Sequence, residues 1–158
     1  MKGVSKAAQH RSLEAARAFD QLIVATRDDS FEVLEARYKA LERQLLRSLV
    51  KTDFERKELR RRIAERLFTE AFGHDCPWPV FGRTLRRIHR LGYSNVERRY
   101  HVACLYAMWC ERHPEHAPRE ARRLLDNTEW HLLRLPRSSQ LRQGLLEALS
   151  KKRRETGL

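Results

Sequence analysis

Apolar residues recur along most of this chain at the spacing of an α-helix. The clearest case is the segment 31–50, where the large apolar residues fall within a narrow arc of the helical wheel, the pattern of a helix lying along one neighbour. They are Leu34, Tyr38, Leu41, Leu45 and Leu49, while Glu35, Lys39 and Arg43 are expected to face away. No run alternates apolar and polar residues as a half-buried strand would. The sequence therefore predicts an all-α fold.

Capping and turn residues divide the chain into about seven helices. Three helix starts are indicated by a capping box, an N-cap residue followed three positions later by glutamate. The pairs are Asp29 with Glu32, Thr52 with Glu55, and Ser94 with Glu97. The expected helices cover 6–25, 31–50, 52–73, 80–91, a fifth from 94 that Pro114 closes, a sixth between Pro118 and Pro136, and a seventh that Ser138 caps and that frays at 151–154.

The segment 74–79, His-Asp-Cys-Pro-Trp-Pro, is the clearest break in the chain, because two prolines and the preceding Gly73 interrupt the helical pattern. It is expected to link an N-terminal half of three helices, 1–73, to a C-terminal four-helix bundle, 80–158. In that bundle the segment 102–110 is apolar on all sides, which is typical of a buried central helix. The two halves are expected to form one compact domain.

The chain is strongly basic, and most of its cations are arginine. Its 158 residues carry 33 Lys and Arg against 21 Asp and Glu, a formal net charge of +12. Guanidinium is a planar fork of hydrogen-bond donors that suits phosphate. This composition favours an anionic partner, although the codon bias of a GC-rich genome would also enrich arginine.

The expected helix 80–91 carries the sharpest charge feature. Its four arginines, Arg83, Arg86, Arg87 and Arg90, share one face, opposite an apolar side. Like charges at this spacing repel one another, and few carboxylates lie nearby in the sequence. The pattern therefore predicts a phosphate-contacting face, unless that face is merely solvated or is neutralised by acidic residues from elsewhere in the fold. Arg98 and Arg99 follow in the chain and are expected to extend the patch.

A second basic cluster covers 56–66, but it is less informative. The helical wheel scatters its cations around the helix, and Glu55, Glu58 and Glu65 interleave with them, so some will form intrahelical ion pairs of little energetic value. Arg60 and Arg61 are nevertheless included among the candidate nucleic-acid contacts. The sequence-specific helix-turn-helix pattern is disfavoured, because Ile88 and Arg98 occupy its two packing positions.

No pattern indicates an enzyme, a cofactor or a metal site. There is no Gly-x-Ser-x-Gly and no glycine-rich phosphate loop. A zinc site that combines residues 74–76 with 110–113 lacks an anchoring CxxC or HxxxH pair, so Cys104 and Cys110 are expected to fill the core. Trp109 and Trp130 are also expected in the core, whereas Trp78 is expected either to cover an interhelical groove or to offer a stacking platform for a base.

The sequence predicts a cytoplasmic protein. The longest apolar stretch, 102–110, is too short for a membrane span, and no apolar segment follows Met1-Lys2-Gly3. Three cysteines without a disulfide spacing pattern fit a reducing compartment.

Short motifs occur in a recognisable order along residues 60–135. They are Ala64-x-x-Leu67-Phe68, Gly82-x-x-Leu85-x-x-Ile88 and Ser94-x-x-Glu97-x-Arg99-Tyr100, followed by Ala121-Arg122-Arg123-Leu124 and Trp130-x-x-Leu133. Their order resembles the small helical subunit of type I CRISPR surveillance complexes, the Cascade assemblies. Residues 1–60 lie outside the resemblance and lack that subunit's Pro-plus-aromatic segment. The resemblance implies a non-catalytic all-α subunit that lines a ribonucleoprotein and holds target or displaced strands through a basic surface.

These patterns together predict a non-enzymatic helical protein that binds the phosphate backbone of DNA or RNA without sequence readout, alongside other protein subunits of a nucleoprotein assembly. The contacts are assigned to the arginines at 83, 86, 87 and 90, helped by those at 98, 99, 60 and 61. The alternative is a protein-interaction module, a regulator or inhibitor whose basic face meets an acidic partner protein and whose leucine seam of 34–49 forms a dimer or docking surface.

Overall fold

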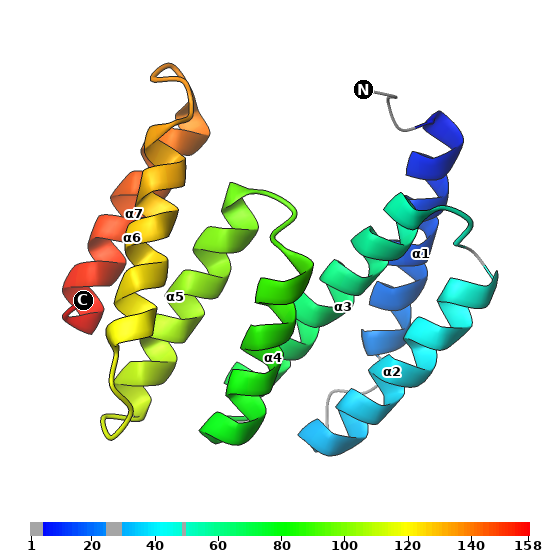
Figure 1. Cartoon of the computed structure of the whole chain (residues 1–158), viewed down its shortest axis with the longest axis horizontal. Coiled ribbons are helices and arrows are strands. Elements are labelled where there is room, and N and C mark those ends of the chain that lie inside the picture. The colour runs from blue at the N-terminus through cyan, green and yellow to red at the C-terminus, as the bar shows by residue number, and fades with distance from the viewer. Residues whose placement is uncertain (1–4, 25–29, 49) are drawn as a thin grey trace. The chain divides into compact units, whose positions relative to one another are not determined.

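The computed structural model describes residues 5–24, 30–48 and 50–158, which form seven α-helices and no strand (Figure 1). The predicted all-α fold is confirmed. Asp29 and Leu49, expected in a cap and in the leucine seam, lie outside the described residues. The helices are α1 (Lys6–Val24), α2 (Phe31–Ser48), α3 (Asp53–Gly73), α4 (Trp78–Leu91), α5 (Val96–Arg112), α6 (Arg119–Leu133) and α7 (Gln140–Thr156).

The chain divides into two compact units, Met1–Gly92 and Tyr93–Leu158. This division differs from the expected boundary at 74–79, because α4 packs on α3 and belongs to the N-terminal unit. The rings of Phe81 on α4 and Phe68 on α3 are both fully buried, with centroids 4.9 Å apart. Residues 74–77 are therefore a tight connection inside the first unit, and α4 begins at Trp78, two residues before the predicted start, because proline is tolerated in the first turn of a helix. The second unit has three helices instead of the four expected.

Helix α3 is the centre of the N-terminal unit, since α1, α2 and α4 all pack on it. Its buried apolar residues are Leu59, Ile63, Ala64, Leu67, Phe68 and Ala71. The described members of the leucine seam on α2, from Leu34 to Leu45, are also buried. Because the core of this unit uses the seam, the seam is not an exposed docking surface.

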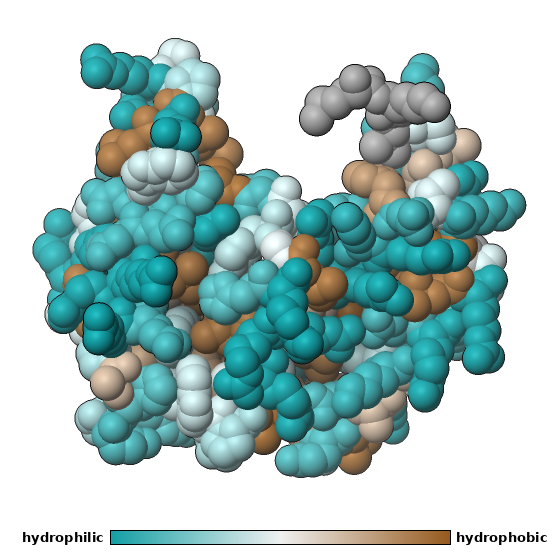
Figure 2. All heavy atoms as spheres, in the orientation of Figure 1, coloured by the Kyte–Doolittle hydropathy of each residue, from teal (hydrophilic) through white to brown (hydrophobic). Residues whose placement is uncertain are grey.

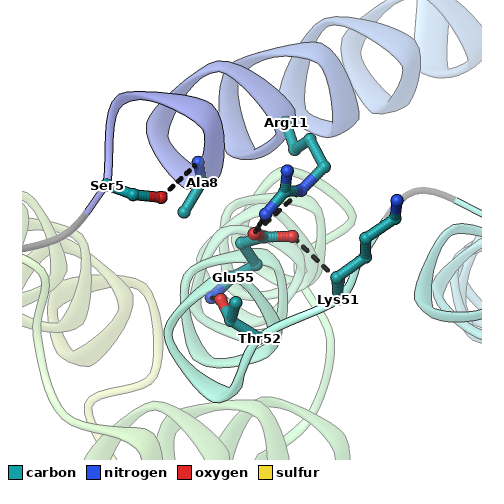
Figure 3. A network of polar contacts seen from close by, with 6 residues as sticks. All are labelled: Ser5, Ala8, Arg11, Lys51, Thr52 and Glu55. Carbon is teal, nitrogen blue, oxygen red and sulfur yellow. Dashed lines mark hydrogen bonds and ion pairs between the residues drawn. The ribbon is translucent and has the colours of Figure 1, made fainter.

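A buried carboxylate joins α1 to α3. The side chain of Glu55 is 0% exposed. Its Oε1 accepts hydrogen bonds from Nε and Nη2 of Arg11 at 3.0 and 2.7 Å, and its Oε2 accepts one from the backbone N–H of Lys51 at 2.9 Å (Figure 3). Thr52 caps α3 as predicted, with its hydroxyl accepting from the Glu55 N–H at 3.3 Å. Glu55 thus fixes both the start of α3 and the neighbouring helix.

Two other helix starts lie one residue later than predicted. Asn95, not Ser94, caps α5 by accepting from the Arg98 N–H, and Ser139, not Ser138, caps α7 by accepting from the Arg142 N–H. The reason is geometric: an N-cap side chain bonds the N–H three positions on, and Val96 and Gln140 are the first residues with helical backbone.

In the C-terminal unit α5 packs on both α6 and α7. Its apolar segment is the expected buried core, and Trp109, Cys104 and Cys110 are buried as predicted. The expected fraying of the last helix at 151–154 is wrong, because α7 continues to Thr156. Arg153 Nη2 binds Asp126 and Glu129 of α6 at 2.7 and 3.0 Å, which ties this end of α7 down.

Candidate nucleic-acid interface

The four arginines of α4 lie on one side of the helix, as their spacing predicts. The opposite side is buried against α3 through Phe81, Leu85 and Ile88. This segregation follows from the helical period, because apolar residues and arginines each recur at intervals of about three or four positions along the helix. In the space-filling view, hydrophilic side chains gather over α4 on the face that is shown (Figure 2).

Helix α2 neutralises two of these arginines. Arg83 Nη2 donates to both carboxylate oxygens of Glu35, at 2.9 and 3.0 Å. Arg87 Nη2 donates to Glu42 at 2.8 Å. The sequence left open that acidic residues from elsewhere in the fold neutralise the arginine face. This is the case for Arg83 and Arg87, whose carboxylate partners lie 48 and 45 residues away in the sequence.

Two adjoining depressions form a groove along these helices. One, of about 180 Å³, has Ala64, Leu67 and Thr84 among its lining residues, and the other, of about 310 Å³, includes Leu91. We call the two together the α2–α4 groove. Its charged lining residues are Glu35, Lys39 and Glu42 from α2, Arg60 from α3, and Arg83, Arg87 and Arg90 from α4.

The α2–α4 groove carries an excess of positive charge. Among the described residues it is lined by five cationic side chains and two carboxylates. Each carboxylate is shared: Glu35 lies 3.7 Å from Lys39 Nζ besides binding Arg83, and Glu42 lies 3.6 Å from Arg60 Nε besides binding Arg87. Three positive charges therefore remain without a counter-ion inside the groove.

Arg86 and Arg90 are the α4 arginines that this pairing leaves out. Both side chains are exposed, and neither forms an ion pair with any residue that the structure describes. Arg90 lines both parts of the groove, whereas Arg86 lies on the same arginine face without lining it. These two residues retain the full hydrogen-bonding capacity of their guanidinium groups for an incoming anion.

The structure separates the other candidate residues. Arg60 joins the groove, but Arg61 does not: its Nε donates to the Leu91 carbonyl at 3.0 Å and its Nη1 to Glu58 at 3.0 Å. Arg61 thus holds α3 against the end of α4, which is a structural role. Arg98 and Arg99 belong to the C-terminal unit, not to the unit that contains the groove.

Sequence reasoning missed the α2 side of the groove, because Glu35 and Lys39 were expected to face away from the fold. The side chain of Glu35 is only 17% exposed and that of Glu42 only 12%. The paired groups do not share one spacing, because Glu35 and Glu42 lie seven residues apart whereas their partners Arg83 and Arg87 lie four apart. The sequence therefore held no simple spacing signal for these pairs.

The cysteines and histidines form no candidate metal centre. Among the described residues, no group of three or more His, Cys, Asp or Glu side chains could hold a metal ion. Burial raises the pKa of Cys76 and of Cys110 to about 11, so both thiols are protonated at neutral pH. His113 instead stacks on Trp109, with ring centroids 4.1 Å apart.

Two tryptophans differ from each other in exposure. Trp130, expected in the core, is 50% exposed, because its side of α6 is not covered within the unit. Trp78 lies against Gly82, where even a Cβ would approach the indole to about 2.9 Å, so this ring covers its own helix. Whether Trp78 also covers an interhelical groove or offers a stacking platform stays a prediction.

No helix in the described part of the chain has the length and apolar character needed to cross a membrane. Searches of protein-family models, curated proteins and solved structures returned no match to the chain. The resemblance to the small subunit of CRISPR surveillance complexes stays a prediction.

Proposed function

We propose that this chain is a non-catalytic protein that binds the phosphate backbone of nucleic acid through the α2–α4 groove, without sequence readout, as a subunit of a nucleoprotein assembly. The supporting observation is the groove's five cations, the exposed Arg90 among them, against two carboxylates, with the exposed Arg86 on the same helix face beside the groove. Phosphates are the anions that such a surface meets along a nucleic-acid strand, and releasing their counterions drives association.

The ion pairs with α2 favour this use of the groove. Glu35 and Glu42 hold Arg83 and Arg87 in fixed positions, so less side-chain entropy is lost when a phosphate binds. Each guanidinium has five donors, and its carboxylate partner engages only part of them. A phosphate can therefore bind the remaining donors without breaking the existing pairs.

The chemistry of the lining suits contacts to phosphate and offers nothing specific for adenine. The residues that line the groove include no Asn or Gln, the side chains that form two hydrogen bonds with the edge of one adenine. Contacts of arginine and lysine to phosphate fix the position of a strand but carry no base information. The predicted resemblance to a strand-holding subunit of a CRISPR surveillance complex agrees with this mode of binding.

Replacing Arg86 and Arg90 with glutamine is expected to weaken binding to a mixed-sequence duplex. Each neutralised phosphate contributes about 0.9 to the slope of log K against log salt, so the slope should fall by about 2 for the pair. At about 0.1 M salt the affinity should fall roughly tenfold or more, because each lost contact removes one counterion-release term. Fluorescence anisotropy over a series of salt concentrations measures both quantities.

The matched control is Lys6→Gln with Arg17→Gln. Both residues are exposed on α1, which contributes no residue to the groove lining, and the change in net charge is the same. We expect the control to bind within about twofold of the wild type, because only long-range charge is lost. Equal loss of affinity in both double variants would remove the assignment of the site to the groove.

Replacing Glu42 with glutamine should have the opposite effect on binding. The change removes a negative charge from the groove and releases Arg87 and Arg60 from their shared partner. We expect tighter duplex binding by about threefold to tenfold and a steeper salt dependence, since one more phosphate can be neutralised. Weaker binding by a folded Glu42→Gln protein would show that holding Arg87 and Arg60 in position matters more for binding than the negative charge that is removed.

The alternative is an interaction module that docks an acidic partner protein. The basic groove is compatible with this alternative, but the leucine seam of α2 cannot serve as its docking surface, because the seam is buried within the unit. A pull-down after nuclease treatment distinguishes the two functions. A partner protein retained without nucleic acid favours the module, and co-purifying nucleic acid with a high ratio of absorbance at 260 to 280 nm favours the proposed function.

A further inference from the structure

The C-terminal unit carries a second surface, which combines an exposed aromatic ring with arginines. Arg123, Asn127 and Trp130 on α6, with Arg134 at its C-cap, follow one another at the spacing of a single helix face. Half of the Trp130 surface is exposed, although the guanidinium carbon of Arg134 lies only 3.7 Å from the centroid of its ring. We call Arg99, Asn127, Trp130 and Arg134 the α6 strip.

The strip is anchored to α5. Arg99 Nη1 donates to Asn127 Oδ1 at 3.2 Å, and the guanidinium carbon of Arg99 lies 4.5 Å from the centroid of the Tyr93 ring. His131 meets Trp130 edge to face, with ring centroids 4.8 Å apart. These contacts hold the two arginines and the indole in a defined arrangement instead of leaving them as mobile surface side chains.

The potential around the strip is positive. Partial burial and then the charges of Arg99 and Arg134 lower the pKa of His131, so both guanidinium groups lie close enough to act on one imidazole. No described carboxylate forms an ion pair with Arg99, Arg123 or Arg134. The nearby acidic residues Asp126 and Glu129 are instead bound to Arg153.

This combination selects a ligand that has both a flat apolar face and a negative charge. Unpaired bases stack on exposed aromatic rings whatever their sequence, and arginines beside the ring contact the adjoining phosphates. In a duplex the bases are stacked on one another, so their faces are not available to an indole. The carboxylates of an acidic protein would pair with the arginines alone, whereas each nucleotide brings a planar base and a phosphate together.

We propose that the α6 strip binds single-stranded nucleic acid by stacking an unpaired base on Trp130, with Arg99 and Arg134 contacting the flanking phosphates. The class of ligand rests on the proposed function, but the residues belong to the other unit of the chain. The strip gives the protein a preference for single strands that the α2–α4 groove, which contacts phosphate alone, does not provide.

The test compares Trp130→Leu with the wild type on two ligands, an oligothymidylate of about 16 nucleotides and a mixed-sequence hairpin duplex. We expect Trp130→Leu to bind the single strand about tenfold more weakly, within the range known for loss of one base stack, and to bind the duplex within about twofold of the wild type. Single-strand binding should also quench the tryptophan emission of the wild type, and most of this quenching should disappear in the variant.

Leu133→Ala is the matched control, because Leu133 is 53% exposed on the same helix but has no ring. It should keep wild-type affinity for both ligands. Unchanged single-strand affinity in Trp130→Leu, or an equal loss for both ligands, would overturn the stacking site. Binding of an acidic protein to this surface without binding of either oligonucleotide would also overturn the stacking site.

Failure of the α6 strip and failure of the proposed function have different signatures. If Arg86→Gln with Arg90→Gln weakens duplex binding while Trp130→Leu changes nothing, the groove stands and the strip is excluded. If Trp130→Leu alone weakens single-strand binding, the strip stands and the groove assignment is excluded. If the wild type binds neither ligand, both proposals are excluded.

Discussion

Replacing Trp109 with alanine is expected to remove most of the stability of the C-terminal unit. The indole is 1% exposed at the centre of that unit, where it stacks on His113 and meets the ring of His116 edge to face. Truncating a large buried aromatic side chain typically costs about 3–5 kcal/mol, because it removes apolar contact and leaves a cavity. A unit of this size typically has a free energy of unfolding of about 3–10 kcal/mol.

Urea unfolding and hydrogen exchange measure this effect. The urea midpoint reported by circular dichroism should fall while the slope of the transition stays similar. Amides of α5–α7 should lose protection in native-state hydrogen exchange. Trp130→Ala is the matched control: the same residue type is half exposed there, so its loss should change stability by about 0.5 kcal/mol or less. Similar losses in the two variants would contradict the burial that separates these tryptophans.

The second large effect is expected at Glu55. Glu55→Gln keeps the shape of the side chain but removes the charge that binds Arg11, and it is expected to destabilise the N-terminal unit by about 2 kcal/mol, because a buried hydrogen-bonding arrangement loses a partner. Arg11→Gln should cost at least as much, because it leaves the fully buried Glu55 carboxylate without its cationic partner, whereas the Arg11 side chain is 26% exposed and water can solvate it when Glu55 is changed.

The effect of Glu55 should depend on pH with a definite sign. The Arg11 guanidinium holds the pKa of Glu55 below its usual value of 4.5, helped by the Lys51 N–H, although burial acts in the opposite direction. A carboxylate whose pKa is lower in the folded than in the unfolded protein stabilises the fold at any pH above its unfolded-state pKa. This stabilisation is lost as the pH falls through the pKa of the group in the folded protein. The stability gap between wild type and Glu55→Gln should therefore be constant near neutral pH and should close below about pH 4.5.

Denaturant unfolding at several pH values between about 3 and 7 tests this expectation. Glu58→Gln provides the control, because Glu58 lies on the same helix but is 30% exposed and pairs with Arg61 three residues away. Its stability difference from the wild type should be small across the range. A stability gap for Glu55→Gln that does not narrow toward the lowest pH would contradict a contribution from the ionised carboxylate that protonation removes.

Local patterns in the sequence were enough to predict several features. The all-α fold, the cap at Thr52 and the buried character of Trp109 follow from residues close together in the chain. The expected division of the chain did not match the two units, because two prolines at 77 and 79 indicate where a helix breaks but not which helix the next one packs against.

At the candidate sites, too, the sequence predicted what lies along one helix but not which residues of other helices lie against it. Periodicity placed the four arginines of α4 on one face, because the 3.6-residue repeat alone determines which side chains are neighbours along a helix. It did not identify Glu35 or Glu42 as partners, nor did it distinguish Arg61, which holds the end of α4, from Arg60, which lines the groove. It also predicted Trp130 to be buried, although the ring is half exposed.

The sequence by itself determined which residues share a helix, which face of that helix is apolar, and that an arginine face exists on α4. Only the tertiary structure decided which of those arginines are paired and which aromatic ring is left exposed. The physical reason is distance along the chain. Helix formation depends on residues three or four positions apart, whereas pairing and burial depend on which helices pack together, here bringing Glu35 to Arg83 across 48 residues.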